Sequence, residues 1–275
     1  MKKKYNFAAL KKSIMKNKFL IVLFTAILTI PAVAQSTGSS EFVQKRNDFE
    51  AMLNSGTKDW YNNPNAKEWF KNCHTNIFSI LDAIEIMPEW RLAIDLPDTD
   101  GLGDESHIYV ENVNSGKKFY GYLNYIKLKS ISAESCWQWF LLYNIRNMLP
   151  TWWHGGYSSS DLILTEEDHQ QILKYIEIIP DSLIDSEEEL TIGGLSETNY
   201  RILKDYKIKP VRVDVNELKR TAEITLCTWN DWVGLTEKNF SIIIKDDNTA
   251  NVENIDYKTI IEYDKTNFRI EAELL

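Results

Sequence analysis

The pattern of hydrophobic and polar positions is densest in one stretch near the middle of the chain. Residues 133–148 place apolar side chains at helical spacing along one face, and Trp139, Leu142 and Tyr143 add apolar surface on the other side. A helix that is apolar nearly all round is buried on most of its faces. The pattern therefore predicts a buried central helix. Its first turn can be capped by the Ser132 hydroxyl.

The segments before this helix contain both helical and strand patterns. Apolar positions at helical spacing predict a first helix around residues 42–53 and a second over residues 66–84, ending near Pro88. Residues 107–129 hold two apolar, aromatic-rich runs on either side of the turn cluster at residues 114–116. Such runs flanking a turn predict a β-hairpin with a half-buried face.

After the central helix the pattern first predicts a strand at residues 162–164. Thr165 followed by Asp168 resembles a capping box, which predicts a helix that Pro180 ends. His169 would lie solvated in the first turn of that helix. Ser196 can cap a further short helix that runs to about residue 206.

From Pro210 onward the hydrophobic period changes to two. The runs at residues 224–229, 240–246 and 259–264 alternate between apolar and polar side chains and are separated by turn residues. This alternating pattern predicts three to five antiparallel strands. The whole chain is therefore expected to be α+β, with N-terminal helices, a β-hairpin, a buried central helix and a C-terminal antiparallel β-meander.

The first 34 residues have a different character. A Lys-rich segment precedes residues 19–30, which carry no charge, and Ala32-Val33-Ala34 follows as an A-x-A cleavage site. We expect residues 1–34 to be a signal peptide cleaved before Gln35, with an uncleaved signal anchor as the alternative. Translation from Met15 instead of Met1 would give a signal of more ordinary length. The expected location is periplasmic or secreted, with membrane contact only during export.

Removal of the signal peptide changes the charge of the protein. It takes away seven Lys and no acidic residue, so 24 basic residues face 40 acidic ones, a net charge of −16. Such acidity repels nucleic acid and anionic membrane surfaces and suits a partner with a basic surface. Residues 35–40 are expected to be a flexible lead-in to a single domain over residues 41–275.

Three cysteines bear on the redox state of an exported chain. Cys73, Cys136 and Cys227 are an odd number, and each has apolar neighbours in the sequence. We expect three buried thiols rather than one disulfide and one free cysteine.

Two Trp-rich segments are the candidate binding sites. Residues 151–161 contain two adjacent Trp, which cannot both face one core from a regular strand because neighbouring side chains alternate. The segment is either a recognition loop or a cap packed over the central helix. A second such turn spans residues 229–232, and the two could together form an aromatic cleft. The candidate binding residues are Trp152, Trp153, His154, Tyr157, Trp229, Asp231 and Trp232.

Recognisable catalytic and metal motifs are missing from the sequence. There is no HExxH, CxxC pair, P-loop, GxSxG elbow or dinucleotide fingerprint. An acidic turn that starts at Asp98 fits a calcium loop poorly, because Leu102 and Tyr109 occupy positions that need oxygen ligands. We therefore expect no metal and no cofactor. Forty carboxylates leave an acid pair of the glycosidase kind neither visible nor excluded.

These features favour an exported, acidic, non-enzymatic binding or interaction protein. One version is an inhibitor or immunity-type protein for a basic protein partner, and another is a glycan binder that stacks sugars on Trp152, Trp153 and Trp229. Two other classes stay open. One is a secreted hydrolase acting through carboxylates, and the other is a structural envelope protein whose Trp residues are core.

Overall fold

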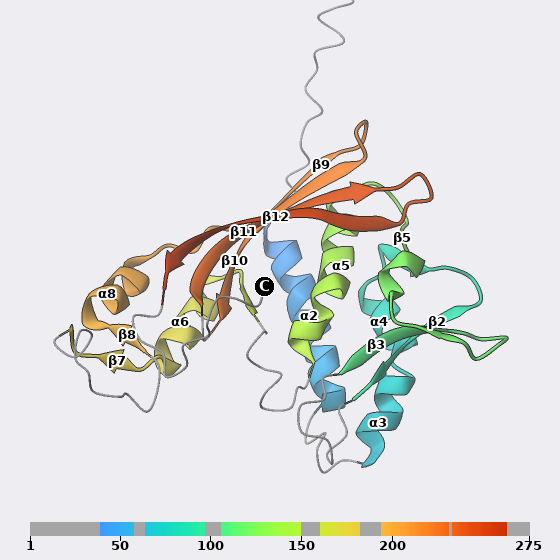
Figure 1. The fold of residues 1–275 in the computed structure, drawn as a ribbon, viewed down its shortest axis with the longest axis horizontal. Coiled ribbons are helices and arrows are strands. Elements are labelled where there is room, and N and C mark those ends of the chain that lie inside the picture. The colour runs from blue at the N-terminus through green and yellow to red at the C-terminus, as the bar shows by residue number, and fades with distance from the viewer. Residues whose placement is uncertain are drawn as a thin grey trace, which may run out of the picture. The chain divides into compact units, whose positions relative to one another are not determined.

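A computed structural model describes residues 39–57, 64–96, 106–149, 160–181, 194–230 and 233–262. These residues all belong to one unit, Gln35–Leu275. The predictions for the signal peptide and for most of the lead-in fall outside the described residues. Helices and antiparallel strands both contribute to the core of the unit, so the α+β class is confirmed (Figure 1).

Two helices lie side by side against one face of the main sheet (Figure 1). They are α2 (Ser39–Thr57) and α5 (Ala133–Tyr143), and the indole N–H of Trp137 joins them by donating to the Phe42 carbonyl at 2.9 Å. Nine of the eleven residues of α5 are buried, which confirms the predicted central helix. The predicted cap is confirmed as well, since the Ser132 hydroxyl accepts the Ser135 N–H. A 3₁₀ turn, η2 (Asn144–Met148), follows α5.

The main sheet is the predicted C-terminal meander with one added strand. Its order is β12-β11-β10-β6, β9 also pairs with β10, and every pairing is antiparallel. The strands are β6 (Asp161–Ile163), β9 (Arg212–Asn216), β10 (Thr221–Asn230), β11 (Gly234–Ile244) and β12 (Ala250–Ile261). The added strand is β6, which the apolar run at residues 162–164 predicted within one residue.

The two faces of this sheet contribute to different hydrophobic clusters. Ile224 and Leu226 of β10 pack in the larger cluster with α2 and α5, whereas Cys227 and Trp229 pack in a smaller one with residues of α8 (Glu197–Asp205). Alternate side chains of a strand point to opposite faces, so one strand can serve both clusters.

The N-terminal half also forms two smaller sheets. One pairs β1 (Ile84–Ile86) with β5 (Ile126–Leu128), and the other has the order β2-β3-β4. Its strands are β2 (Trp90–Asp95), β3 (His107–Asn112) and β4 (Lys118–Phe119). The hairpin of β3 and β4 around the turn at residues 114–116 is confirmed, but its second strand is short. A 3₁₀ turn, η1 (Tyr122–Tyr125), redirects the chain into β5.

The prediction of one helix over residues 66–84 is wrong. The segment forms α3 (Pro64–Lys71) and α4 (His74–Ile80), and its last apolar residue lies in β1. The Asn72 side chain donates to the Glu68 carbonyl at 3.0 Å, and this side-chain bond competes with continuation of the helical ladder.

The helix after β6 is α6 (Glu166–Tyr175), and its predicted capping box is confirmed by both reciprocal hydrogen bonds. It ends at Tyr175 rather than at Pro180, because Ile178–Ile179 form β7, which pairs with β8 (Leu195–Ser196). The expectation that His169 is solvated is wrong. His169 shares a helix face with Ile172, three residues on, and both are buried. No described helix has the length and apolar character needed to cross a membrane.

Candidate functional site

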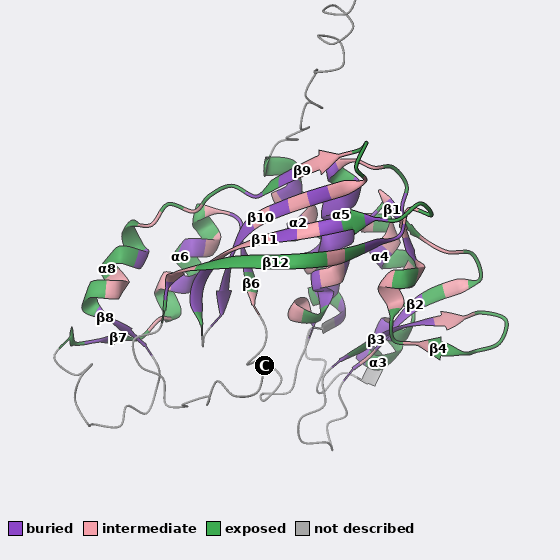
Figure 2. Ribbon diagram, turned by 45° about the horizontal axis from the view of Figure 1, so that its top comes forward, coloured by how far each residue is buried: buried purple, intermediate pink, exposed green. Residues whose placement is uncertain are grey.

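The outer edge of β12 is a free edge of the main sheet. β12 is the terminal strand, and Figure 2 shows it exposed along most of its length. In the described part of the chain, its free side meets one isolated bridge, between Lys127 and Thr249, just before the strand begins. An edge strand of this kind presents a row of unpaired N–H and C=O groups.

An open groove of about 590 Å³ lies beside this edge. One wall is formed by Leu123 of η1 with Trp139 and Tyr143 of α5, and the other by residues 251–255 of β12. Trp139 and Tyr143 are four residues apart on α5, so their rings stack, with centroids 5.7 Å apart. The helical spacing of the central helix therefore builds the aromatic wall of the groove.

Behind the groove wall lies a buried polar atom. Trp139 is 1% exposed, and among the described residues its buried indole N–H has no hydrogen-bond partner. A buried indole N–H usually finds an acceptor, and leaving one unpaired costs about 1–3 kcal/mol.

Apolar side chains continue from the groove along the free edge. Ile255 stands opposite Phe240 and Tyr257 opposite Lys238, so both side chains lie on the sheet face that carries the groove. They are 41% and 72% exposed. Exposed apolar groups that adjoin a groove are typical of an interaction site.

Two exposed carboxylates lie along this edge strand. A β-bulge displaces Glu253, which lines the groove, whereas Asp256 stands opposite Asn239 on the other face of the sheet. Neither carboxylate forms an ion pair with the residues that the structure describes. They remain available for a cationic group from a partner.

A second polar cluster surrounds the buried Arg46 of α2. Its guanidinium binds both carboxylate oxygens of Asp168 at 2.9 and 2.8 Å, donates to the Leu162 carbonyl at 3.2 Å, and lies 3.6 Å from Glu50. Burial raises the pKa of Glu50, Arg46 opposes this, and the charges of Asp168 and Asp161 add to it. The cluster therefore places a carboxyl with a raised pKa beside the same guanidinium that pairs with Asp168.

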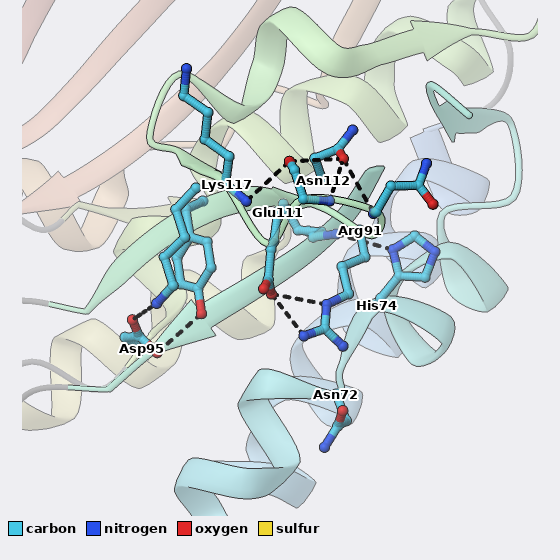
Figure 3. Close-up of polar contacts among 12 residues, drawn as sticks. Asn72, His74, Arg91, Asp95, Glu111, Asn112 and Lys117 are labelled. Carbon is cyan, nitrogen blue, oxygen red and sulfur yellow. Dashed lines mark hydrogen bonds and ion pairs between the residues drawn. The ribbon is translucent and has the colours of Figure 1, made fainter. Parts of the chain in front are cut away.

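A third cluster covers the hairpin (Figure 3). Lys118 Nζ lies 3.1 Å from Asp95 and 4.1 Å from the centroid of the Tyr109 ring, and Tyr109 donates to Asp95 at 3.3 Å. A hydrogen bond with Tyr109, followed by those with Asp95, raises the pKa of Lys118 to about 12. These groups satisfy one another across β2, β3 and β4, so we interpret the cluster as a support for the hairpin.

His74 completes the same region. Its Nδ1 accepts the Leu92 N–H at 3.2 Å, and burial, with the charge of Arg91, lowers its pKa (Figure 3). The partly buried ring therefore serves as an acceptor for the backbone of β2. Among the described residues, no three His, Cys, Asp or Glu side chains are grouped to hold a metal ion.

The predicted binding residues fall mostly outside the description. Trp152, Trp153, His154, Tyr157, Asp231 and Trp232 are not among the described residues, so the aromatic cleft stays a prediction. Trp229 is described, and it is 3% exposed within the smaller cluster. Residues 97–105, which contain most of the acidic turn, also lie outside.

The groove itself was not predicted from the sequence. Trp139 and Tyr143 were interpreted as apolar positions of the central helix, and the last strand was predicted at residues 259–264, whereas β12 spans Ala250–Ile261. Alternation identifies a strand but does not reveal whether it lies at an edge.

The three cysteines are all buried and free, as the sequence predicted. Burial raises the pKa of Cys73 and of Cys136 to about 12, and it also raises that of Cys227. A thiol with a raised pKa is a poor nucleophile at neutral pH.

Comparisons of the chain with models of protein families, with curated proteins and with solved structures found no match.

Proposed function

We propose that this chain is an exported, non-enzymatic binding protein that takes a partner protein with a basic surface. The observation that carries the proposal is the groove beside the free edge of β12, which is lined by Tyr143, Ile255 and the carboxylate of Glu253. A groove with aromatic anchors and few convergent polar groups is the usual form of a recognition site. The specific role that we propose is that of an inhibitor or immunity-type protein, which neutralises its basic partner.

The charge of the chain supports the same reading. A net charge of −16 after loss of residues 1–34 would attract a basic partner and speed the encounter. Charge-steered association weakens as salt screens it, and the Debye length falls to about 3 Å at 1 M salt.

The test is a capture experiment with tagged residues 35–275 in the envelope and medium of the producing organism, read by mass spectrometry at two salt concentrations. We expect one stoichiometric, basic protein that is lost at high salt. An unrelated protein of equal negative charge and similar size is the control for non-specific capture. Recovery of the same proteins by both baits, or of none, would contradict the proposal.

A hydrolase is the second candidate, and the raised pKa of Glu50 favours it. Pairs of carboxyl groups with different environments are typical of acid–base catalysis, and Glu50 lies close to the ion-paired Asp168. A panel of saccharide and peptide substrates, assayed with the parent protein and with Glu50→Gln, tests this. Turnover that the substitution abolishes would move the assignment to an enzyme. A glycan binder would instead retain an oligosaccharide without turning it over.

A further inference from the structure

We propose that the partner is bound as an added β-strand. An extended segment with alternating apolar and basic side chains pairs with the free edge of β12 and fills the adjacent groove. This inference rests on the proposed function and specifies its binding mode.

The backbone of β12 offers the length that such pairing needs. β12 spans twelve residues, and the bridge of Lys127 to Thr249 lies before its first residue. Extended peptides bind exposed sheet edges through main-chain hydrogen bonds, while pockets for alternate side chains give specificity. Among the described residues, no second strand pairs with the outer side of β12 between Ala250 and Ile261.

The two faces of the edge differ in chemistry. On the groove face stand Ile255, which lines the groove together with Trp139 and Tyr143, and Tyr257. On the opposite face the exposed Asp256 stands opposite Asn239 of β11. Because side chains of the added strand alternate, its apolar residues would face the groove and its basic residues would lie on the face of Asp256.

Charge decides between a partner segment and a second copy of this chain. Two copies, each with a net charge of −16 after export, would repel one another. A basic segment does not meet this obstacle, so we assign the site to one.

The experiment uses the protein exported by its own leader and a labelled synthetic peptide of alternating Lys and Val. Fluorescence anisotropy should show saturable binding that weakens with salt. Ile255→Lys and Tyr257→Lys should each weaken it at least about tenfold, a loss of ~1.4 kcal/mol. Tyr257 is 72% exposed, so its variant tests the site even where the other substitution disturbs folding.

The chain provides a matched control. Ile243 of β11 is 37% exposed, close to the 41% of Ile255. It lies three residues after Phe240 in the same strand, so its side chain points to the other face of the sheet. Ile243→Lys should leave the affinity within about twofold, well under the tenfold step of 1.4 kcal/mol. Equal losses from Ile243→Lys and Ile255→Lys would overturn the proposal.

Two further peptides separate backbone pairing from simple charge attraction. A peptide of alternating Glu and Val should not bind, and the Lys and Val peptide methylated on alternate backbone nitrogens should bind at least about tenfold more weakly. Undiminished binding of either peptide would overturn strand addition. So would a concentration-dependent dimer that Tyr257→Lys abolishes, because a second copy would then occupy the edge.

Failure of the binding mode can be told apart from failure of the function. A purified basic partner that binds parent protein and Ile255→Lys equally, and still dissociates with salt, would leave the function standing and remove the strand-addition mode. Absence of any salt-sensitive protein partner would remove the function itself.

Discussion

At the scale of single residues, Arg46 connects parts of the fold that are far apart in sequence. Its guanidinium joins α2 to the Leu162 carbonyl and to Asp168, which also accepts the N–H groups of Leu164 and Thr165. The side chain of Arg46 is 6% exposed and that of Asp168 is 21% exposed, so the pair is largely removed from water. Loss of one partner of a buried pair leaves the other charge without compensation.

Arg46→Met should therefore lower the free energy of unfolding by about 3 kcal/mol, the lower end of the range for broken buried pairs, because Asp168 keeps its two N–H donors. Urea denaturation followed by circular dichroism measures the change. Arg201→Met is the control, since the Arg201–Glu197 pair is exposed on both sides and should contribute less than about 0.5 kcal/mol. Equal effects of the two substitutions would refute this account of Arg46.

Glu50 predicts a pH dependence of stability. Its pKa is raised in the folded protein, chiefly by burial, from an ordinary value of 4.5. Ionisation is therefore less favourable folded than unfolded, and stability falls as the pH rises through the folded pKa. Glu50→Gln should be more stable than the parent protein at neutral pH, and the difference should shrink as the pH drops below 4.5. Thermal unfolding of both proteins between pH 3 and pH 7 would measure this difference in stability. A difference that grows as the pH falls would contradict the prediction.

At the scale of elements, local signals in the sequence were reliable and tertiary ones were not. Ser132 and Thr165 were correctly predicted as caps, because a cap depends on a few neighbouring residues. The helix expected over residues 66–84 is interrupted after Lys71, and its last apolar residue, Ile84, pairs in β1 with β5 instead. β2 was not predicted at all.

The same distinction explains the candidate site. The aromatic wall depends on the i, i+4 spacing of Trp139 and Tyr143, which the sequence contains. The position of this wall next to β12 depends on which strand lies at the edge of the sheet, and that is a property of the whole topology. Exposure of an edge arises only when every other strand has found its neighbours, so no local pattern reports it.

The hairpin between β10 and β11 depends on one glycine. Gly234 has φ +93°, and a Cβ there would collide with the Ile261 carbonyl of β12. Gly234→Ala should destabilise the protein by more than about 1 kcal/mol, the usual cost of placing a side chain at positive φ, because the clash adds to it. Differential scanning calorimetry gives the change in Tm.

Gly116 is the control for this prediction. It has φ +67°, but a Cβ there would meet its nearest atom at 3.7 Å, an ordinary contact. Gly116→Ala therefore isolates the conformational cost from the steric one. If it lowers Tm as much as Gly234→Ala, the carbonyl contact contributes nothing.

At the scale of the whole molecule, the main sheet is the common wall of two hydrophobic clusters. Leu141 of α5 lies in the larger cluster and Leu203 of α8 in the smaller, and both are fully buried. β10 supplies alternate side chains to both, so unfolding of either cluster exposes a face of the same strand. The sheet should therefore couple the two clusters into one cooperative transition.

This coupling gives the last prediction. Leu141→Ala and Leu203→Ala should each lower the free energy of unfolding by about 2–5 kcal/mol, because each leaves a cavity in a packed interior. Both should shift one transition that Trp fluorescence and circular dichroism report at the same denaturant concentration. Trp137 lies in the larger cluster and Trp229 in the smaller, so the fluorescence signal samples both. A separate early transition in Leu203→Ala alone would show that the smaller cluster unfolds independently. The two faces of the sheet would then lose their packing independently. The structure of the groove beside β12 would depend on the larger cluster only.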